Sequence, residues 1–527
     1  MRGAVPPTDY MHVCLGMVFL RYLSAAFERN TRSFWRRPTP TRRTCGGGVV
    51  WPSGQAALSR KQFPPANSRI CQKSSNFPTD HSVSLLMPSD TSPAAFEASV
   101  YRKVTWRLIP VLFSCYILAY VDRVNVGFAK LSMTTEPWFS EAVFATGAGV
   151  FFIGYFFFEV PGNIILHRVG ARLWIARIMV GWGIVSMLMA LSYSKESFYW
   201  LRFLLGIAEA GFFPGIILYL TYWYPREHRA RIVALFMTAV AVAGIIGGPL
   251  SGWILNVTEG WHGARNWQWL FILEGIPTLL LGCAVPFILA DRSEKAKWLT
   301  AEEKAILVAK LDTDQRRKTA EGHHAHHALD AFRSPRVWLC CAIYFGIVAG
   351  TYGVSFWLPQ IIKDTLTKDP WEVGLYSAIP WACAAVGMIF VSRHSDRTGE
   401  RRWHVGLSAL VSAAAFAFAA SSIPGLPPGV VLAILALAVT GVMSAISCFW
   451  AIPTAILSGS AAAAGIAWIN SVGNLAGYVS PEMVGWLKKH YDMNAALCGL
   501  AALLAMAGLL VICTIRPSPP TAAFADA

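Results

Sequence analysis

Two opposite charges stand side by side inside one of the most apolar stretches of this sequence. In "CYILAYVDRVNVGFAKLSM", residues 115–133, Asp122 and Arg123 interrupt a run that is otherwise suited to lipid. An ionised side chain at the centre of a bilayer costs about 2.5–3.5 kcal/mol on insertion scales, so such residues usually face a protein interior or a water-filled path. The pair is either a packing device or part of a working site, and we interpret it as functional.

Four further charged residues lie in apolar stretches before residue 290: Glu159, Arg202, Glu209 and Glu274. Arg202 and Glu209 are seven residues apart, which is two helical turns, so both project from one face of a helix about 10 Å apart along its axis. A carboxyl group held away from water beside a positive charge can gain and lose a proton as that charge moves. This chemistry suits a proton-coupled carrier. For Glu159 and Glu274 we favour a structural role.

The second part of the sequence has almost no charge in its apolar stretches. It offers neutral polar and aromatic side chains instead, namely Tyr352, Gln360, Ser447, Trp450, Asn470 and Asn474. The asymmetry predicts a charged half that handles protons and a neutral half that shapes a binding pocket.

The composition indicates which elements must position these residues. Of 527 residues, 55% are hydrophobic and 14% are charged, whereas soluble proteins carry about 25% charged residues. The sequence therefore predicts an all-α membrane protein. Apolar stretches of about 20 residues predict twelve transmembrane helices, at 106–127, 143–166, 173–193, 198–223, 232–256, 268–290, 337–361, 374–392, 404–422, 429–450, 461–487 and 493–514.

The longest polar connection separates two sets of six predicted helices. We expect a first half at 106–290, a linker at 291–336 and a second half at 337–514. The connections after the second, fourth, sixth and eighth helices hold most of the Lys and Arg residues, so this side should be cytoplasmic. Both termini, including residues 87–105 and 515–527, would then be cytoplasmic.

A weak internal repeat supports the division into halves. A basic, glycine-containing turn follows the start of each half at a similar distance, with Gly170 placed 64 residues after Trp106 and Gly399 placed 62 residues after Val337. The positive-inside rule alone explains the basic residues of these turns. It does not explain their glycines or their matching spacing. We favour two related halves with parallel topology and a substrate site near the midplane between them.

Residues 1–86 differ from the rest of the chain. They hold 12 Lys and Arg residues against 3 Asp and Glu residues, so +9 of the net charge of +15 lies there. The basic balance is therefore a poor argument for nucleic-acid binding. We interpret 1–86 as an upstream extension outside the working protein, because Met87 opens a plausible N-terminus; the alternative is a targeting or regulatory segment.

The sequence lacks the patterns that typify ATPases, common hydrolases and cofactor enzymes. It has no Walker loop, nucleophile elbow or dinucleotide fingerprint, so we expect neither an enzyme nor a cofactor. The eleven cysteines show no metal-binding spacing. The run "HHAHH" at 323–327 could bind a divalent metal weakly, but a solvated polar loop is the favoured interpretation.

Several motifs in fixed order resemble the anion:cation symporter family of the major facilitator superfamily. They are "CYILAYVDRVNVGFAKLSM", "GYFFFEVPGNIILHRVGARLWIARIM", "RFLLGIAEAGFFPGIILYLTYWYP", "GGPLSGWIL", "EKAKWLTAEEK", "FWLPQIIK" and "NSVGNLAGYVSP". The resemblance covers about residues 100–515. It implies a monomeric carrier of the bacterial inner membrane that imports a small organic anion, such as a sugar acid, tartrate, phthalate or hydroxyphenylacetate, together with protons.

The resemblance also implies roles for individual residues. Asp122 and Glu209 would bind the protons, while Arg123 and Arg202 would interact with the anion or with those acids. The remaining positions that would line the cavity or contact the substrate are Tyr120, Tyr155, Gln360, Ser447, Trp450 and Asn470.

Two positions depart from the family pattern. Val240 replaces a polar glutamine of sugar-acid carriers, which puts a polyhydroxylated substrate in doubt, and His167 stands where the superfamily motif has Asp.

Two other functions remain open at this point. "GIIGGPLSG" partly resembles a motif of antiporters, which would make the protein an organic anion exchanger, although a kinked and closely packed helix is the favoured interpretation. A nutrient sensor without transport is less favoured, because the linker and the tail offer no added signalling domain.

Overall fold

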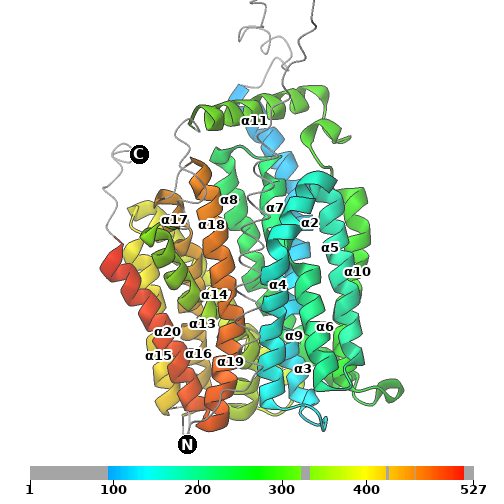
Figure 1. The fold of residues 1–527 in the computed structure, drawn as a ribbon, viewed down its shortest axis with the longest axis vertical. Coiled ribbons are helices and arrows are strands. Elements are labelled where there is room, and N and C mark those ends of the chain that lie inside the picture. The colour runs from blue at the N-terminus through cyan, green and yellow to red at the C-terminus, as the bar shows by residue number, and fades with distance from the viewer. Residues whose placement is uncertain (1–92, 322–332, 423–425, 457–458, 516–527) are drawn as a thin grey trace, which may run out of the picture. The chain divides into compact units, whose positions relative to one another are not determined.

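The computed structural model describes residues 93–321, 333–422, 426–456 and 459–515, which all belong to the compact unit Thr79–Ala527. The predictions for 1–86, for "HHAHH" at 323–327 and for nearly all of the tail at 515–527 lie outside the described residues. The described chain is helical and contains no strand (Figure 1).

The helices before the linker are α2 (Pro93–Val124), α3 (Val126–Met133), α4 (Glu141–Val169), α5 (Ala171–Leu188), α6 (Lys195–Glu209), α7 (Phe212–Thr221), α8 (Arg226–Met237), α9 (Ala239–Val257) and α10 (Asn266–Ile288). The linker contains α11 (Ala301–Glu321). The helices after it are α13 (Pro335–Thr365), α14 (Pro370–Thr398), α15 (Arg402–Ser422), α16 (Pro428–Phe449), α17 (Ala451–Ile456), α18 (Gly459–Asn474), α19 (Ala476–His490) and α20 (Met493–Thr514). Short 3₁₀ turns occur at Met189–Leu191, Trp261–Gly263 and Ser293–Lys295.

Eleven helices of the described chain, counting continuous pairs as one, are long and apolar enough to cross a membrane. They correspond to eleven of the twelve predicted spans. The segment predicted at 461–487 is helical too, but Leu475 separates it into α18, with 16 residues, and α19, with 15 residues. Large apolar side chains such as Phe287, Phe390 and Leu280 are exposed on the outer surface, as expected of a surface that faces lipid.

A break in the fourth predicted span determines the position of Glu209. α6 ends at Glu209, and α7 starts three residues later at Phe212. Gly211 joins them with φ = 83°, a left-handed conformation that glycine adopts without the steric cost of a side chain. Arg202 and Glu209 therefore lie on one helix, as the spacing predicted, and the acid occupies its C-terminal end.

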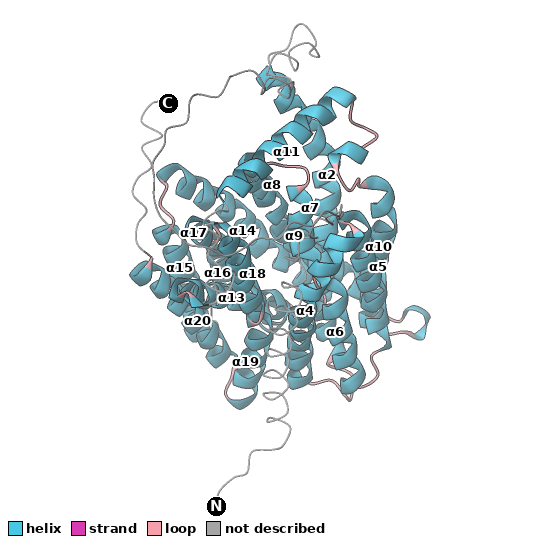
Figure 2. Cartoon of the chain, turned by 45° about the horizontal axis from the view of Figure 1, so that its top comes forward, coloured by secondary structure: helices cyan, strands magenta, loops and turns pink. Residues whose placement is uncertain are grey.

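The linker helix α11 lies across the ends of α2 and α8 (Figure 2). Ion pairs fix it there: Lys103 with Glu303 at 2.8 Å, Lys310 with Glu97 at 3.0 Å and Arg229 with Asp314 at 3.3 Å. Burial acts to raise the pKa of Glu303, but the hydrogen bonds and charge of Lys103 outweigh it and hold that pKa below its usual value. All three pairs join the linker to the first half.

The opposite end of the helices is closed by a group of side chains that we name the Lys130 cluster: Lys130, Glu141, Phe144, Trp357 and Lys488. Lys130 of α3 is fully buried, and its Nζ lies 2.7 Å from Glu141 and 3.8 Å from the ring centre of Trp357 on α13. Lys488 of α19 reaches the other oxygen of Glu141 at 3.1 Å. The cluster therefore joins both halves through ion pairs and cation–π contacts.

Glycines bring the two halves close along α9 and α14. A Cβ atom added at Gly248 of α9 would lie 2.7 Å from the carbonyl oxygen of Gly374 on α14 and 3.3 Å from Cβ of Ser377. Small residues at such positions let helix backbones approach closely in membranes. This contact supports the close-packing interpretation of "GIIGGPLSG".

We expect Gly248→Ala to destabilise the contact between the halves by about 1–3 kcal/mol, the usual cost of overpacking. Gly181→Ala on α5 is the matched control, since an added Cβ atom there would have nothing within 4 Å. The measurement is the melting temperature of the purified protein in detergent. A Gly248 variant that melts with the control, rather than below it, would contradict this account of the packing.

We expect Lys130→Met to open the closed end, because Glu141 loses its buried partner and Trp357 loses its closest cation. Hydrogen–deuterium exchange should become several-fold faster in residues 126–146. Lys195→Met is the control, since Lys195 is exposed and pairs only with its neighbour Glu196 in the described structure. Exchange that stays at the wild-type rate in Lys130→Met would show that the cluster does not hold this end closed.

Candidate functional site

The site is organised around a buried ion pair between Arg123 and Glu209. Arg123, near the end of α2, donates from Nε to Oε1 of Glu209 at 3.1 Å, and its Nη2 contacts the same oxygen. Its Nη1 donates to the hydroxyl of Tyr352 on α13 at 2.9 Å. A guanidinium from the first half thus touches both the Glu209 carboxylate of its own half and the Tyr352 phenol of the other half.

Aromatic rings surround this pair. The guanidinium carbon of Arg123 lies 5.6 Å from the ring centres of Phe151 and Tyr155 on α4. Arg202 lies over the same Phe151 ring at 5.1 Å. Aromatic rings exclude water, and their faces attract cations. Because water is excluded, the electrostatic interactions of both guanidinium groups are screened only weakly.

Arg202 is fully buried and only partly paired. Its Nε donates to the carbonyl oxygen of Gly147 at 3.0 Å, while its two Nη atoms have no hydrogen-bond partner in the described part of the chain. Buried polar groups are normally hydrogen-bonded. The N–H groups at these two atoms of Arg202 therefore remain available to donate to an anionic group.

Asp122 points away from Arg123, although the two are adjacent. Its carboxylate accepts hydrogen bonds from Trp182 at 2.8 Å and Ser186 at 3.1 Å on α5, and from Thr278 on α10 at 2.6 Å. Successive helical residues project about 100° apart, which explains the separation. Arg123 reaches the fourth predicted span, whereas Asp122 reaches the third and the sixth.

A cavity lies between the two halves beside Arg123. Both halves supply its lining, which consists of Tyr116, Tyr120, Arg123, Tyr155, Phe213, Met237, Val240, Tyr344, Val348, Thr351, Tyr352, Met388, Met443, Ile446, Trp450, Asn470 and Asn474. Arg123 is the single charged member of this lining, so one carboxylate can be matched by one guanidinium, while the hydroxyl and amide groups can bind further polar atoms.

Five of the residues expected at the substrate site line this cavity: Tyr120, Arg123, Tyr155, Trp450 and Asn470. The sequence argument did not single out Tyr116, Met388 and Met443, whose residue types are common in any apolar helix. Tyr344, Val348 and Tyr352 share one face of α13, and this spacing of four residues could have identified them together.

Other expected site residues do not line the cavity in this structure. Gln360 donates to Asp364 at 2.7 Å near the Lys130 cluster. Ser447 bonds with Ser392 at 2.9 Å. Arg202 lies behind Phe151, and Asp122 is enclosed within the first half.

Glu159 contacts the opposite half directly. Asn470 of α18 donates to one oxygen of Glu159 at 3.0 Å, and Ser471 donates to the other at 3.2 Å. Glu159 therefore connects α4 to α18, and it orients Asn470 at the edge of the cavity.

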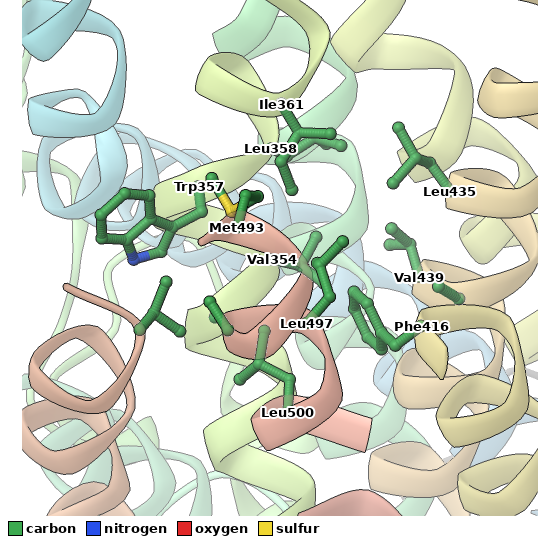
Figure 3. A pocket seen from close by; sticks show the side chains of 14 residues that line it. Val354, Trp357, Leu358, Ile361, Phe416, Leu435, Val439, Met493, Leu497 and Leu500 are labelled. Carbon is green, nitrogen blue, oxygen red and sulfur yellow. The ribbon is translucent and has the colours of Figure 1, made fainter. Parts of the chain in front are cut away.

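A second pocket, inside the second half, has a different character. Only apolar side chains and a glycine besides Trp357 line it, including Val354, Phe416, Leu435 and Leu497 (Figure 3). Such a space suits no carboxylate.

Among the described residues, no group of three or more His, Cys, Asp or Glu side chains could hold a metal ion.

Known proteins share this sequence and fold. The profile of the Major Facilitator Superfamily matches residues 112–481. A candidate tartrate transporter of Agrobacterium vitis is 47% identical over 431 residues, covering 80% of this chain and 93% of that protein. The inner membrane transport protein RhmT of Escherichia coli K12 is 36% identical over 419 residues, covering 79% of this chain and 95% of that protein.

The solved structure of a D-xylose–proton symporter has the same fold, with a TM-score of 0.61 at 16% identity, over 78% of this chain and 98% of that chain. The family match spans more than half of the chain, and the two relatives align over nearly their full lengths. The chain therefore belongs to the major facilitator superfamily, and it is a multi-pass secondary transporter and not an enzyme.

Proposed function

We propose that this transporter imports a small organic carboxylate together with protons, as a member of the anion:cation symporter family. The observation that carries the proposal is the buried contact of Arg123 with Glu209 at the wall of the cavity between the halves. In this contact, a group that can bind an anion, the guanidinium of Arg123, directly touches a group that can bind a proton, the carboxylate of Glu209.

The pair links anion binding to proton binding. When Glu209 takes a proton, it no longer needs Arg123 as a counter-charge, and the guanidinium becomes available to a substrate carboxylate. When the substrate leaves, Arg123 is again a buried charge without a partner, which favours loss of the proton from Glu209. Arg202, with its free Nη donors, would assist by attracting either anion.

Asp122 is proposed as the second proton site. If Asp122 and Glu209 each take one proton with a monovalent anion, one net positive charge enters in every cycle. A membrane potential of 100 mV then contributes about 2.3 kcal/mol per cycle beyond the pH gradient. The uptake of a monovalent anion would therefore be electrogenic.

The cavity lining supports a carboxylate with a moderately polar body. Tyr120, Tyr352 and Asn470 can bind hydroxyl groups of the substrate, whereas Val240 and Met443 favour an apolar portion. The name of the Agrobacterium vitis relative points to a hydroxy acid. We therefore place tartrate and related organic acids first among the substrates to be tested. Arg202, Gln360 and Ser447 would approach the substrate in another conformation of the carrier.

The proposed setting is the inner membrane of a bacterium, with both termini cytoplasmic and the protein active as a monomer. The name of the Escherichia coli relative supports the location. The two halves, 106–290 and 337–514, would rock against each other around the cavity. The α11 side would face the cytoplasm, so the Lys130 cluster would close the outer side.

The test uses purified protein in vesicles with an imposed pH gradient, an imposed potential or a preloaded anion. Radiolabelled tartrate and a panel of other organic acids should accumulate when protons flow inward, and a monovalent substrate should produce an inward current. Uptake that requires only an internal anion would instead identify an exchanger. Binding without any transport would identify a sensor.

We expect Glu209→Gln to abolish accumulation driven by protons, because a permanently neutral side chain cannot bind and release the coupling proton. Exchange of labelled for unlabelled substrate should persist, since the amide fills the same space. Glu196→Gln, an exposed position on the same helix, should behave as the wild type. Accumulation against a gradient by the Glu209 variant would remove this residue from the coupling mechanism.

We expect Arg202→Lys to weaken substrate binding about ten- to a hundredfold, since an ammonium keeps the charge but loses the forked donors that match a carboxylate. This range corresponds to about 1.5–3 kcal/mol, the contribution of a charged hydrogen bond. Arg177→Lys on α5, where Arg177 is exposed, is the control. Equal affinities, measured by calorimetry, would exclude Arg202 from anion recognition.

A further inference from the structure

A second acidic group lies inside the first half, away from the substrate cavity. Glu274 of α10 and Asp122 of α2 are 3% and 2% exposed. Ser251 of α9 donates to one oxygen of Glu274 at 2.6 Å. Thr278, one helical turn after Glu274, donates to Asp122 at 2.6 Å. One face of α10 therefore carries Glu274 and also binds Asp122 through Thr278.

Neither of these carboxyl groups has a positive partner among the residues that the structure describes. Around Glu274 the polar groups are Ser251 from α9, and Asp122 and Asn125 from the α2–α3 region. Around Asp122 they are Trp182 and Ser186 from α5 and Thr278 from α10. The charge of Glu209 on α6 also acts on Asp122, while the adjacent Arg123 is bound to Glu209. No Lys, Arg or His of the described chain forms an ion pair with either acid.

Burial without a cation makes two negative charges here very costly. An ionised carboxylate in an apolar interior is stable only if it is paired, and otherwise the group takes up a proton. Two carboxyl groups that act on each other resist simultaneous ionisation further. At least one proton is therefore expected to reside on Asp122 or Glu274.

The side chain of Asn125 is independent evidence that a polar molecule can bind between Asp122 and Glu274. It is 1% exposed, and its amide lies close enough to Glu274 to act on it. Within the described chain, neither atom of this amide, nor the second oxygen of Glu274, makes a hydrogen bond of ordinary geometry. Asn125 follows Asp122 by three residues, so both project from the same side of the helix. Unpaired buried polar atoms are rare, and a bridging water with these atoms as partners would satisfy them.

We propose that Glu274 is a proton-binding residue that shares its proton with Asp122 through a water held by Asn125. In the transfer, the O–H bond of Glu274 breaks as an O–H bond forms at Asp122, and the pair keeps its total charge. This proposal differs from the structural role that the sequence analysis favours for Glu274. It rests on the proposed proton coupling, and it separates the path of this proton from the cavity that holds the anion.

The test compares infrared spectra and transport of Glu274→Gln with those of the wild type. Glu274→Gln should lose one carbonyl-stretch band of a protonated carboxyl group, and the pH of half-maximal uptake should fall by about one unit, since Asp122 loses a neighbour that can be negative. Exchange of labelled substrate should persist. An unchanged set of bands, or an unchanged pH profile, would overturn the proposal.

Two further variants distinguish proton binding from packing. Ser251→Ala removes the hydrogen bond to Glu274 but leaves its carboxyl group, so the band should shift and not disappear. Glu274→Asp should shift the band and retain coupled uptake, and it decides the matter if Glu274→Gln does not insert, because an unshifted spectrum would then refute the proposal. Failure of the wild type to couple uptake to protons would instead refute the proposed function.

Discussion

The buried pair of Arg123 and Glu209 is the constraint on which the rest of the site depends. Removing one partner of a buried pair typically costs 3–5 kcal/mol, so the helices must bring both groups together. The break at Gly211 ends α6 at Glu209, and α2 carries Arg123 to it. Tyr352 of the second half binds the same guanidinium. A change in the pair therefore also alters a hydrogen bond between the two halves.

Helix α2 separates two polar systems that lie on different sides of it. Arg123 lies in the wall of the cavity and is bound to Glu209, whereas Asp122 faces Trp182 and Thr278 within the first half. No hydrogen bond joins Asp122 to Arg123 in the described structure. The two systems can therefore influence each other through the position of α2 and through longer-range electrostatics.

Sequence reasoning identified features that lipid itself imposes. Long apolar stretches made the spans recognisable, and the rarity of charge within them drew attention to Asp122 and Glu209, which are buried in the structure. It could not foresee that Asn470 binds Glu159 or that Lys130 is fully buried against Trp357, because those contacts form only when residues more than 200 positions apart approach. The division of one predicted span into α18 and α19 at Leu475 was not foreseen either.

The two ends of the molecule are held by different means, and this difference suits alternating access. At one end, the Lys130 cluster joins α3 and α4 to α13 and α19, so opening that end requires ion pairs and cation–π contacts across the halves to separate. At the other end, the ion pairs of α11 reach α2 and α8 of the first half. The linker can then move with the first half as a unit. A rearrangement of Arg123, Glu209 and Tyr352 would alter the contact between the two halves near the middle, because Arg123 and Tyr352 belong to opposite halves.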